Sequence, residues 1–310
     1  MSSSVAGQLL ATAEALTTAL AAGSVTQLLA VGARCTVNGH RIDPTGSGPA
    51  SAPDGLGLLI GSTLLAQGPV IDVDTGQAGL FAVAHPGRPA TDDGPVDGGA
   101  ADGGPVVVGL RFRGGAGPLL VDELEVLVSP PGRSSVFAPD RLGTGNPIFD
   151  AAVDGPAPSR ADLVAVAASY FDDIEAGTGH TRFQPGCQRI ENGFQTTSIP
   201  AVAGGAATAE QFERRFFAYI TAVRGRRYPI VDRARGVVWA VAFLDVAGTV
   251  THLQRPDGGR VELPERLRRP RSTLLFERFK VIDGALAWIE AVMVNLPFGA
   301  PTGWEQTDPS

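Results

Sequence analysis

Apolar residues recur at helical spacing in four stretches of the chain, and each stretch is followed by glycine, proline or a polar run. Ser159 and Asp162 have the spacing of an N-cap signature at the start of the third stretch, and Thr208 with Gln211 would form a capping box in the fourth. The predicted helices cover residues 6–22, 55–66, 159–175 and 208–226.

Short apolar runs bounded by turn residues predict strands between and after these helices. Asp283 and Gly284 separate the last two runs, and this residue pair favours a tight hairpin turn. Helices followed by a series of strands indicate the α+β class. The predicted strands cover residues 35–40, 70–73, 80–85, 106–113 and 119–128 in the first half, and 187–192, 228–231, 236–244, 249–253, 274–281 and 286–296 in the second.

The pattern of the first half returns in the second. Asn38-Gly39 recurs as Asn192-Gly193, 154 positions later, and the Pro69 to Asp72 segment recurs 160 positions later. Near the ends of the halves the spacing is 167 positions. Arg111-Phe112-Arg113 then matches Arg278-Phe279-Lys280, Glu123 matches Glu290, and Pro130-Pro131-Gly132 matches Pro297-Phe298-Gly299. Such a period is too long for a solenoid repeat. It predicts one domain used twice, over residues 1–156 and 157–310, with residues 86–104 as a flexible surface insertion in the first.

Composition narrows the functional classes. The 310 residues carry a net charge of −7, which disfavours nucleic-acid and anionic-membrane partners. Lys280 is the only lysine, so a Schiff base could form only there. Cys35 and Cys187 are expected to be lone buried thiols, and no zinc-binding spacing occurs. With no positively charged leader and no apolar run of membrane-spanning length, we expect a cytoplasmic protein. Arginine outnumbers lysine 24 to 1, which with abundant Ala, Gly and Pro indicates a bacterial gene, and no cofactor is expected.

Four segments of the second half form a recognisable set: Cys187-Gln-Arg-Ile-Glu-Asn-Gly193, Val223-Arg-Gly-Arg-Arg-Tyr-Pro229, Glu277-Arg-Phe-Lys280, and Pro297-Phe-Gly299 near Gly303-Trp304. With these segments the second half resembles the SnoaL-like group of the NTF2-like fold, and specifically a branch of uncharacterised domains. The resemblance covers residues 160–304 well and residues 6–132 weakly. It implies two tandem cone-shaped α+β barrels, packed sheet against sheet as an internal pseudo-dimer and open to further self-association.

The resemblance also implies a mostly apolar pocket with a few inward-facing ionisable groups, which can raise a carboxylate pKa toward neutrality. In epoxide-hydrolysing relatives the inward positions of the final strand are catalytic, and they match Glu290, which becomes the first candidate for a catalytic base. The alternative is that Glu290 pairs with an arginine and only holds the barrel together. Arg189 and Glu191 share one face of a strand. They are either an oxyanion-binding cation with a second carboxylate or a buried ion pair.

Five further side chains are candidates. Tyr170 could donate a phenolic hydrogen bond in catalysis, or be a core tyrosine. Glu277 lies between apolar residues on one strand face and would face a ligand or the domain interface. His180 would lie at the pocket mouth or in a solvated loop. Trp239 and Trp304 would form pocket walls or a lid.

Tyr228 is added to the expected substrate-binding residues, and no metal ligand is expected. The favoured function is a cofactor-independent lyase, dehydratase or isomerase that uses general acid/base chemistry on a small, mostly apolar aromatic or carbonyl compound. Its site would be in the second domain. The alternative is a non-catalytic small-ligand-binding or scaffold protein of the same fold. A carboxylate that titrates well above its usual pKa would favour the enzyme.

Overall fold

The computed structural model describes residues 4–42, 55–86, 104–115, 119–200, 202–254 and 258–304. Nearly all of the expected insertion at residues 86–104 lies outside the described residues.

One sheet forms within the first half of the chain. Its strands run in the order β2-β1-β7-β6-β5-β3, with β4 beside β5. Neighbouring strands are antiparallel except for β1 and β7, the first and last, which are parallel. The elements are α1 (Val5–Ala22), η1 (Val25–Leu28), β1 (Leu29–Val37), β2 (His40–Ile42), η2 (Leu56–Leu59), β3 (Thr63–Ala66), β4 (Val70–Asp72), β5 (Gln77–His85), β6 (Val106–Gly114) and β7 (Val121–Ser129).

The second half forms its own six-stranded sheet with the order β10-β11-β14-β15-β8-β9, again with its first long strand parallel to its last. A separate β12–β13 hairpin leaves this sheet. The elements are α2 (Pro139–Gly143), η3 (Pro147–Phe149), α3 (Arg160–Ala176), β8 (Phe183–Glu191), β9 (Phe194–Gln195), η4 (Ala203–Gly205), α4 (Thr208–Glu213), β10 (Ala222–Asp232), β11 (Val237–Val246), β12 (His252–Gln254), β13 (Arg260–Glu262), α5 (Glu265–Arg268), β14 (Arg271–Ile282) and β15 (Ala285–Leu296).

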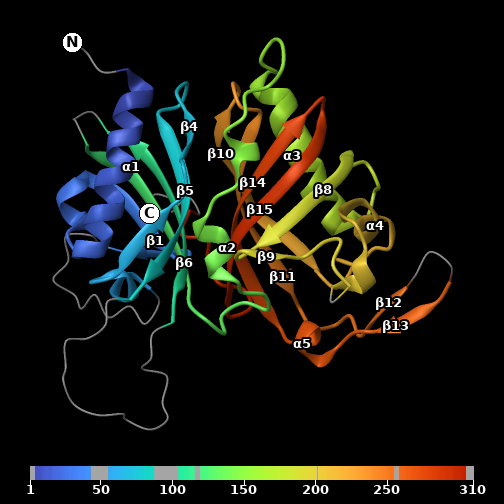
Figure 1. The fold of residues 1–310 in the computed structure, drawn as a ribbon. Coiled ribbons are helices and arrows are strands. Elements are labelled where there is room, and N and C mark those ends of the chain that lie inside the picture. Colours follow the sequence, from blue (N-terminus) through green and yellow to red (C-terminus); the bar gives the residue numbers. More distant parts are fainter. Residues whose placement is uncertain are drawn as a thin grey trace, which may run out of the picture.

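The α+β class is confirmed, and the two sheets lie face to face in the middle of the molecule (Figure 1). Helix α1 covers the outer face of the first sheet, and α3 covers the outer face of the second. Each half therefore has one apolar core between its helix and its sheet, and a third apolar cluster joins the two sheets.

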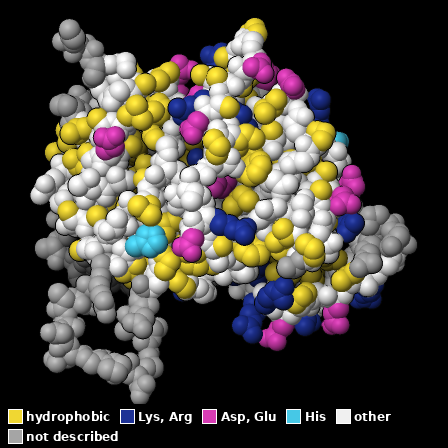
Figure 2. Space-filling model, in the orientation of Figure 1, with side chains coloured by type: hydrophobic (Ala, Val, Ile, Leu, Met, Phe, Trp, Pro, Cys, Tyr) yellow, Lys and Arg dark blue, Asp and Glu magenta, His cyan; other side chains and the backbone are white. Residues whose placement is uncertain are grey.

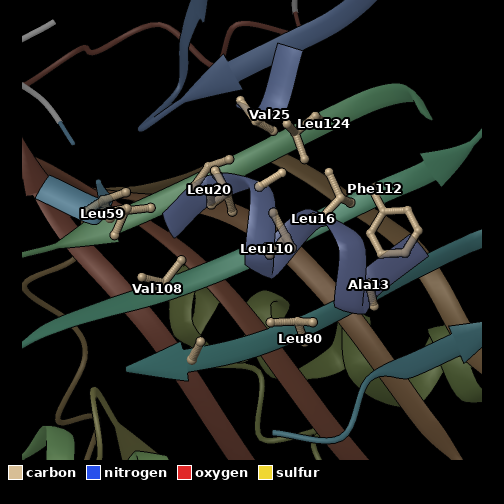
Figure 3. Packing of buried hydrophobic residues seen from close by; sticks show 14 of the residues in the cluster. Ala13, Leu16, Leu20, Val25, Leu59, Leu80, Val108, Leu110, Phe112 and Leu124 are labelled. Carbon is tan, nitrogen blue, oxygen red and sulfur yellow. The ribbon is translucent and has the colours of Figure 1, made fainter. Parts of the chain in front are cut away.

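Helix α1 begins at Ser4, whose side chain accepts a hydrogen bond from the Gly7 amide at 3.2 Å, and ends at Gly23 in the left-handed conformation. By length and composition it is the one helix in the described residues that could cross a membrane. In this structure its apolar face packs on the first sheet, with Leu16 against Leu110 and their neighbours (Figure 3). Apolar side chains fill the space that the helix and the sheet enclose.

Two helix predictions are wrong in part. Residues 55–66 form a short 3-10 turn and strand β3. The amphipathic run at residues 208–226 is helical only in α4, because Arg215 takes a positive φ of 52° and β10 already begins at Ala222. From Ala222 on, the segment pairs with β11 and buries Val223, so tertiary structure overrides the local pattern. Arg224, Arg226 and Arg227, at the end of the predicted helix, consequently lie on a strand.

Strand registers correct one detail of the sequence comparison. Arg278 lies opposite Glu290, whereas Arg111 lies opposite Glu125. The spacing of 167 equates Glu123 with Glu290, which is wrong by two residues because the connection between β6 and β7 is longer than the Asp283-Gly284 turn.

Aromatic side chains of the second sheet pack directly against two glycines of the first sheet. By register, Gly79 corresponds to Trp239 and Gly109 to Phe276. A Cβ atom on Gly79 would lie 3.1 Å from the Trp239 ring, and one on Gly109 would lie 2.8 Å from the Phe276 ring. Corresponding positions thus meet each other across the interface, as residues near a two-fold axis do. Here one partner is small and the other large.

Replacing Gly109 with alanine is expected to destabilise the protein by about 1–3 kcal/mol, because the added methyl group has no room beside the Phe276 ring. Urea denaturation measures this as a lower midpoint at an unchanged slope. Gly68→Ala is the control, since its Cβ would meet only Asp150 Oδ1 at 3.5 Å. Equal midpoints for the two variants would contradict tight packing at Gly109.

Candidate active site

A cavity of about 840 Å³ lies between the second sheet, α3, α4 and the segment that carries the β12–β13 hairpin. Its wall is mostly apolar, with Phe216, Phe217, Leu244, Leu275 and Met293 among the lining residues. Four polar side chains lie together at its buried end, and we call them the polar quartet: Tyr170, Arg189, Glu191 and Glu277.

Strand alternation places the quartet. On β8, Arg189 and Glu191 are two residues apart and so face the same side, as the sequence analysis predicts. On β14, Glu277 faces the cavity with Leu275. The open alternative for Glu277, a place in the interface between the halves, is therefore excluded. Tyr170 comes from the face of α3 that packs on the sheet.

Arg189 is fixed from several sides. Its Nε lies 3.0 Å from Glu191 Oε1 and donates to Thr196 Oγ1 at 3.1 Å, and its Nη2 donates to Gln211 Oε1 at 2.6 Å. Its Nη1 is buried and has no hydrogen-bond partner among the described residues. Burial lowers the pKa of Arg189, but Glu191 and the other quartet members outweigh this and raise it. The result is a permanent, immobile cation with one donor still unused.

Glu277 is the titratable centre of the quartet. Burial, reinforced by the charge of Glu191, raises the pKa of Glu277 from 4.5 to about 8, although Arg189 and a hydrogen bond with Tyr170 oppose the shift. Its Oε2 atom is buried without a partner in the described part of the chain. Burial also raises the pKa of Tyr170 well above its usual value. At neutral pH the site holds a carboxyl group that can readily gain or lose a proton.

Glu290 does not lie in this cavity. It faces the interface between the halves, where its Oε2 accepts from Arg278 Nε at 2.8 Å, and Gln67 of the first half contacts both side chains. The sequence interpretation placed it on the wrong face of β15: on this strand Met293 and Asn295 line the cavity, so Glu290, at the other parity, points away. The expectation that Glu290 is a catalytic base is corrected. Its ion pair joins the two halves.

Two of the expected substrate-binding residues also lie away from the cavity lining. Trp239 is fully buried between the sheets and packs on Phe81, with ring centroids 4.6 Å apart. Tyr228 packs near Phe171, and burial raises its pKa to about 12. Neither contributes to the wall described above.

The remaining two candidates are on the surface or at the interface. His180 is exposed, in a loop whose backbone amides donate to Asp173. This agrees with the solvated-loop alternative. Trp304 packs against the first half, where the Arg34 guanidinium lies 4.1 Å from its ring centre. It is therefore neither a wall nor a lid of the cavity.

Sequence reasoning missed Gln211, Tyr219 and Arg271, which also line the cavity. Gln211 was assigned to a helix cap, but its side chain holds Arg189 and the Thr196 carbonyl, while Glu210 binds the amide of Ala207 at the helix start. Arg271 could have been found from its place six residues before Glu277 on one strand, since even spacing keeps both on one face.

The first half provides an internal comparison for the quartet. Strand registers and the matched helix ends place apolar residues at all four corresponding positions, and each is at most 2% exposed. A sheet with the same strand order thus forms in the first half without charged residues at the four positions. The corresponding residues are Leu16 for Tyr170, Cys35 for Arg189, Val37 for Glu191 and Leu110 for Glu277.

Among the described residues, no group of three or more His, Cys, Asp or Glu side chains is arranged to hold a metal ion. Fold and site together define an α+β protein with a mostly apolar cavity and a buried, titratable carboxyl group at its inner end.

Comparison with known proteins adds three findings. Residues 156–293 match a family described as "Domain of unknown function (DUF8021)". A solved structure assigned as a ketosteroid isomerase from Kribbella flavida is similar at 16% identity and a TM-score of 0.26, covering 42% of this chain and 88% of that one. A solved structure assigned as a SnoaL-like polyketide cyclase from Jannaschia sp. CCS1 is similar at 17% identity and a TM-score of 0.23, covering 45% of this chain and 91% of that one. No curated protein matches the chain.

Proposed function

We propose that the protein is a cofactor-independent acid/base enzyme that acts on a small, mostly apolar carbonyl compound in the cavity of the second half. The observation that carries this proposal is the position of Glu277, which is buried at the end of an apolar cavity beside a fixed arginine, an environment that raises its pKa to about 8. Groups with a pKa near the working pH transfer protons most effectively. Lyases, dehydratases and isomerases that act through an enolate need such a transfer at the carbon next to the carbonyl group.

The quartet supports separate roles. Glu277 would accept a proton from the carbon next to the carbonyl and return it. The unused Nη1 of Arg189 and the Tyr170 hydroxyl would donate to the oxygen that gains negative charge. Glu191 would keep Arg189 in position through the contact at 3.0 Å. A buried donor and a buried acceptor without partners are costly unless a ligand uses them.

The first half strengthens the case against a purely structural role. Apolar residues occupy all four corresponding positions and still support the same strand order. We therefore infer that the charges of the quartet are kept for chemistry or binding. We further propose that the halves are tandem NTF2-like domains, since equal strand order and the meeting of corresponding residues at the interface are what a fused dimer would have.

Proton exchange tests the activity without knowledge of the full reaction. Incubated in D₂O with a panel of aryl ketones, the protein is expected to catalyse deuterium incorporation at the carbon next to the carbonyl, followed by NMR. Glu277→Gln should slow this exchange by about 10²–10⁴-fold. Glu213→Gln, an exposed carboxylate of α4 outside the cavity lining, should leave it unchanged.

The runner-up, a small-ligand-binding protein, predicts a different result. Ketones of the panel would then bind with no exchange above the rate in buffer. Exchange that survives in Glu277→Gln would assign the proton transfer to another group.

A further inference from the structure

One strand lines the cavity along much of its length. Arg271, Thr273, Leu275 and Glu277 alternate on β14 and all face the cavity. At about 3.3 Å per residue, Arg271 and Glu277 are roughly 20 Å apart along the strand. Glu277 is at the buried end, and Arg271 is partly exposed. The strand therefore connects the proposed proton-transfer site with the mouth of the cavity.

The Arg271 guanidinium is fixed in place, and it forms no ion pair with an acidic side chain in the described ranges. Its Nη1 donates to the backbone carbonyls of Arg266 at 3.3 Å and Arg269 at 3.1 Å, which fixes the guanidinium. Burial lowers the pKa of Arg271, with Tyr219 opposing the shift. A partly desolvated guanidinium with unused nitrogens is suited to a planar, bidentate anion.

The surroundings of Arg271 are positively charged. Arg266 also lines the cavity and is exposed, and dark-blue side chains gather where Figure 1 places α5 (Figure 2). Arg214 lines the cavity as well, but it pairs with Glu210 at 3.4 Å. Glu262 is the acidic residue at this rim, and Arg268 lies 4.0 Å from it. Between the rim and the quartet the wall is apolar, with Leu244, Val246, Leu263 and Leu275. The cavity is thus cationic at its mouth, apolar in the middle and acid/base at its end.

We propose that the natural ligand is an elongated amphipathic carboxylate, whose anionic end binds Arg271 with help from Arg266 while its carbonyl end reaches Glu277. This inference rests on the proposed function only in assigning a carbonyl group to the end of the ligand that lies near Glu277. A neutral ligand would leave Arg271 half-desolvated without a counter-charge, and a short acid could not reach both groups.

The test uses a series of aryl keto acids, Ph–CO–(CH₂)n–COO⁻ with n from 2 to 8, each compared with its methyl ester by calorimetry on the full chain. We expect an intermediate n to bind best, and the acid of that length to bind about 10- to 100-fold tighter than its ester. Arg271→Gln should reduce this acid-to-ester ratio to near 1 and leave ester binding within about two-fold, which also shows that the variant is folded.

Two further variants complete the design. Arg271→Lys should keep part of the preference, because the charge remains but the fork geometry is lost. Arg269→Gln is the matched control: this exposed side chain pairs with Glu265 at 3.0 Å and does not line the cavity, so the ratio should be that of the wild type.

An unchanged ratio in Arg271→Gln, equal binding of acid and ester by the wild type, or failure of every acid to bind would overturn the proposal. The experiments can refute the anion site and the proposed enzyme activity independently of each other. Glu277→Gln should lose proton exchange but keep the acid preference. A wild-type protein that prefers acids yet exchanges no protons would refute the enzyme and leave the anion site standing.

Discussion

Glu277→Gln is expected to make the protein more stable than the wild type at pH 8, although it replaces a buried side chain. In the unfolded chain Glu277 loses its proton near pH 4.5, whereas in the folded protein it keeps the proton up to about pH 8. Between these values the unfolded state binds fewer protons, so the contribution of Glu277 to stability falls as pH rises. The fall is at most about 1.4 kcal/mol per pH unit.

A glutamine cannot titrate and lacks this dependence. The difference in unfolding free energy between variant and wild type should therefore grow in favour of the variant from pH 4.5 to 8, and stay small below pH 4.5. Urea denaturation at half-unit pH steps measures it. A difference that does not change with pH would show that Glu277 ionises normally in the folded state, which would also remove the support for proton transfer at neutral pH.

The same substitution at Glu290 is expected to have the opposite effect. Glu290→Gln leaves the Arg278 guanidinium buried without its counter-charge, and removing one partner of a buried ion pair typically costs about 3–5 kcal/mol. Because the pair also contacts Gln67 of the first half, its loss should weaken the attachment of the two halves. The prediction is a lower urea midpoint, without the pH-dependent gain of Glu277→Gln.

A companion variant separates a charge effect from a packing effect. Replacing both Arg278 and Glu290 with leucine should recover part of the lost stability, since no unpaired charge remains, although Gln67 Oε1 loses its donor. Proton exchange by this double variant should match the wild type. If Glu290→Gln were as stable as the wild type, or if the double variant alone lost exchange, the assignment of Glu290 to the interface would be wrong.

Local signals in the sequence were sufficient for much of the fold. Gly23 and Ser159 mark helix ends that the structure contains, and the Asp283-Gly284 turn joins β14 to β15. These signals act through the residue's own backbone and its nearest neighbours, so they can be recognised without knowing the rest of the chain. The run at residues 208–226 shows the limit of such signals. Its spacing fits a helix, but from Ala222 on it forms a strand that pairs with β11.

For the site, the sequence placed Arg189 and Glu191 on one face, and identified Tyr170 and Glu277 as candidates. It failed for Glu290, Trp239 and Trp304, which are all bound into the contact between the halves. The second sheet has two buried faces, one on the cavity and one on the first sheet. Both faces therefore read as apolar runs with an occasional charge, and the pattern cannot tell them apart.

By itself, then, the sequence determined the α+β class, most element positions and the pairing of residues by strand parity, because these depend on short-range periodicity. Only the tertiary structure decided which parity faces the cavity. It also revealed that Gln211 fixes Arg189 and that Arg271 shares a wall with Glu277. Such contacts join residues that the chain brings together only when helix and sheet pack, so the chemistry of a buried carboxyl group is a property of the folded enclosure.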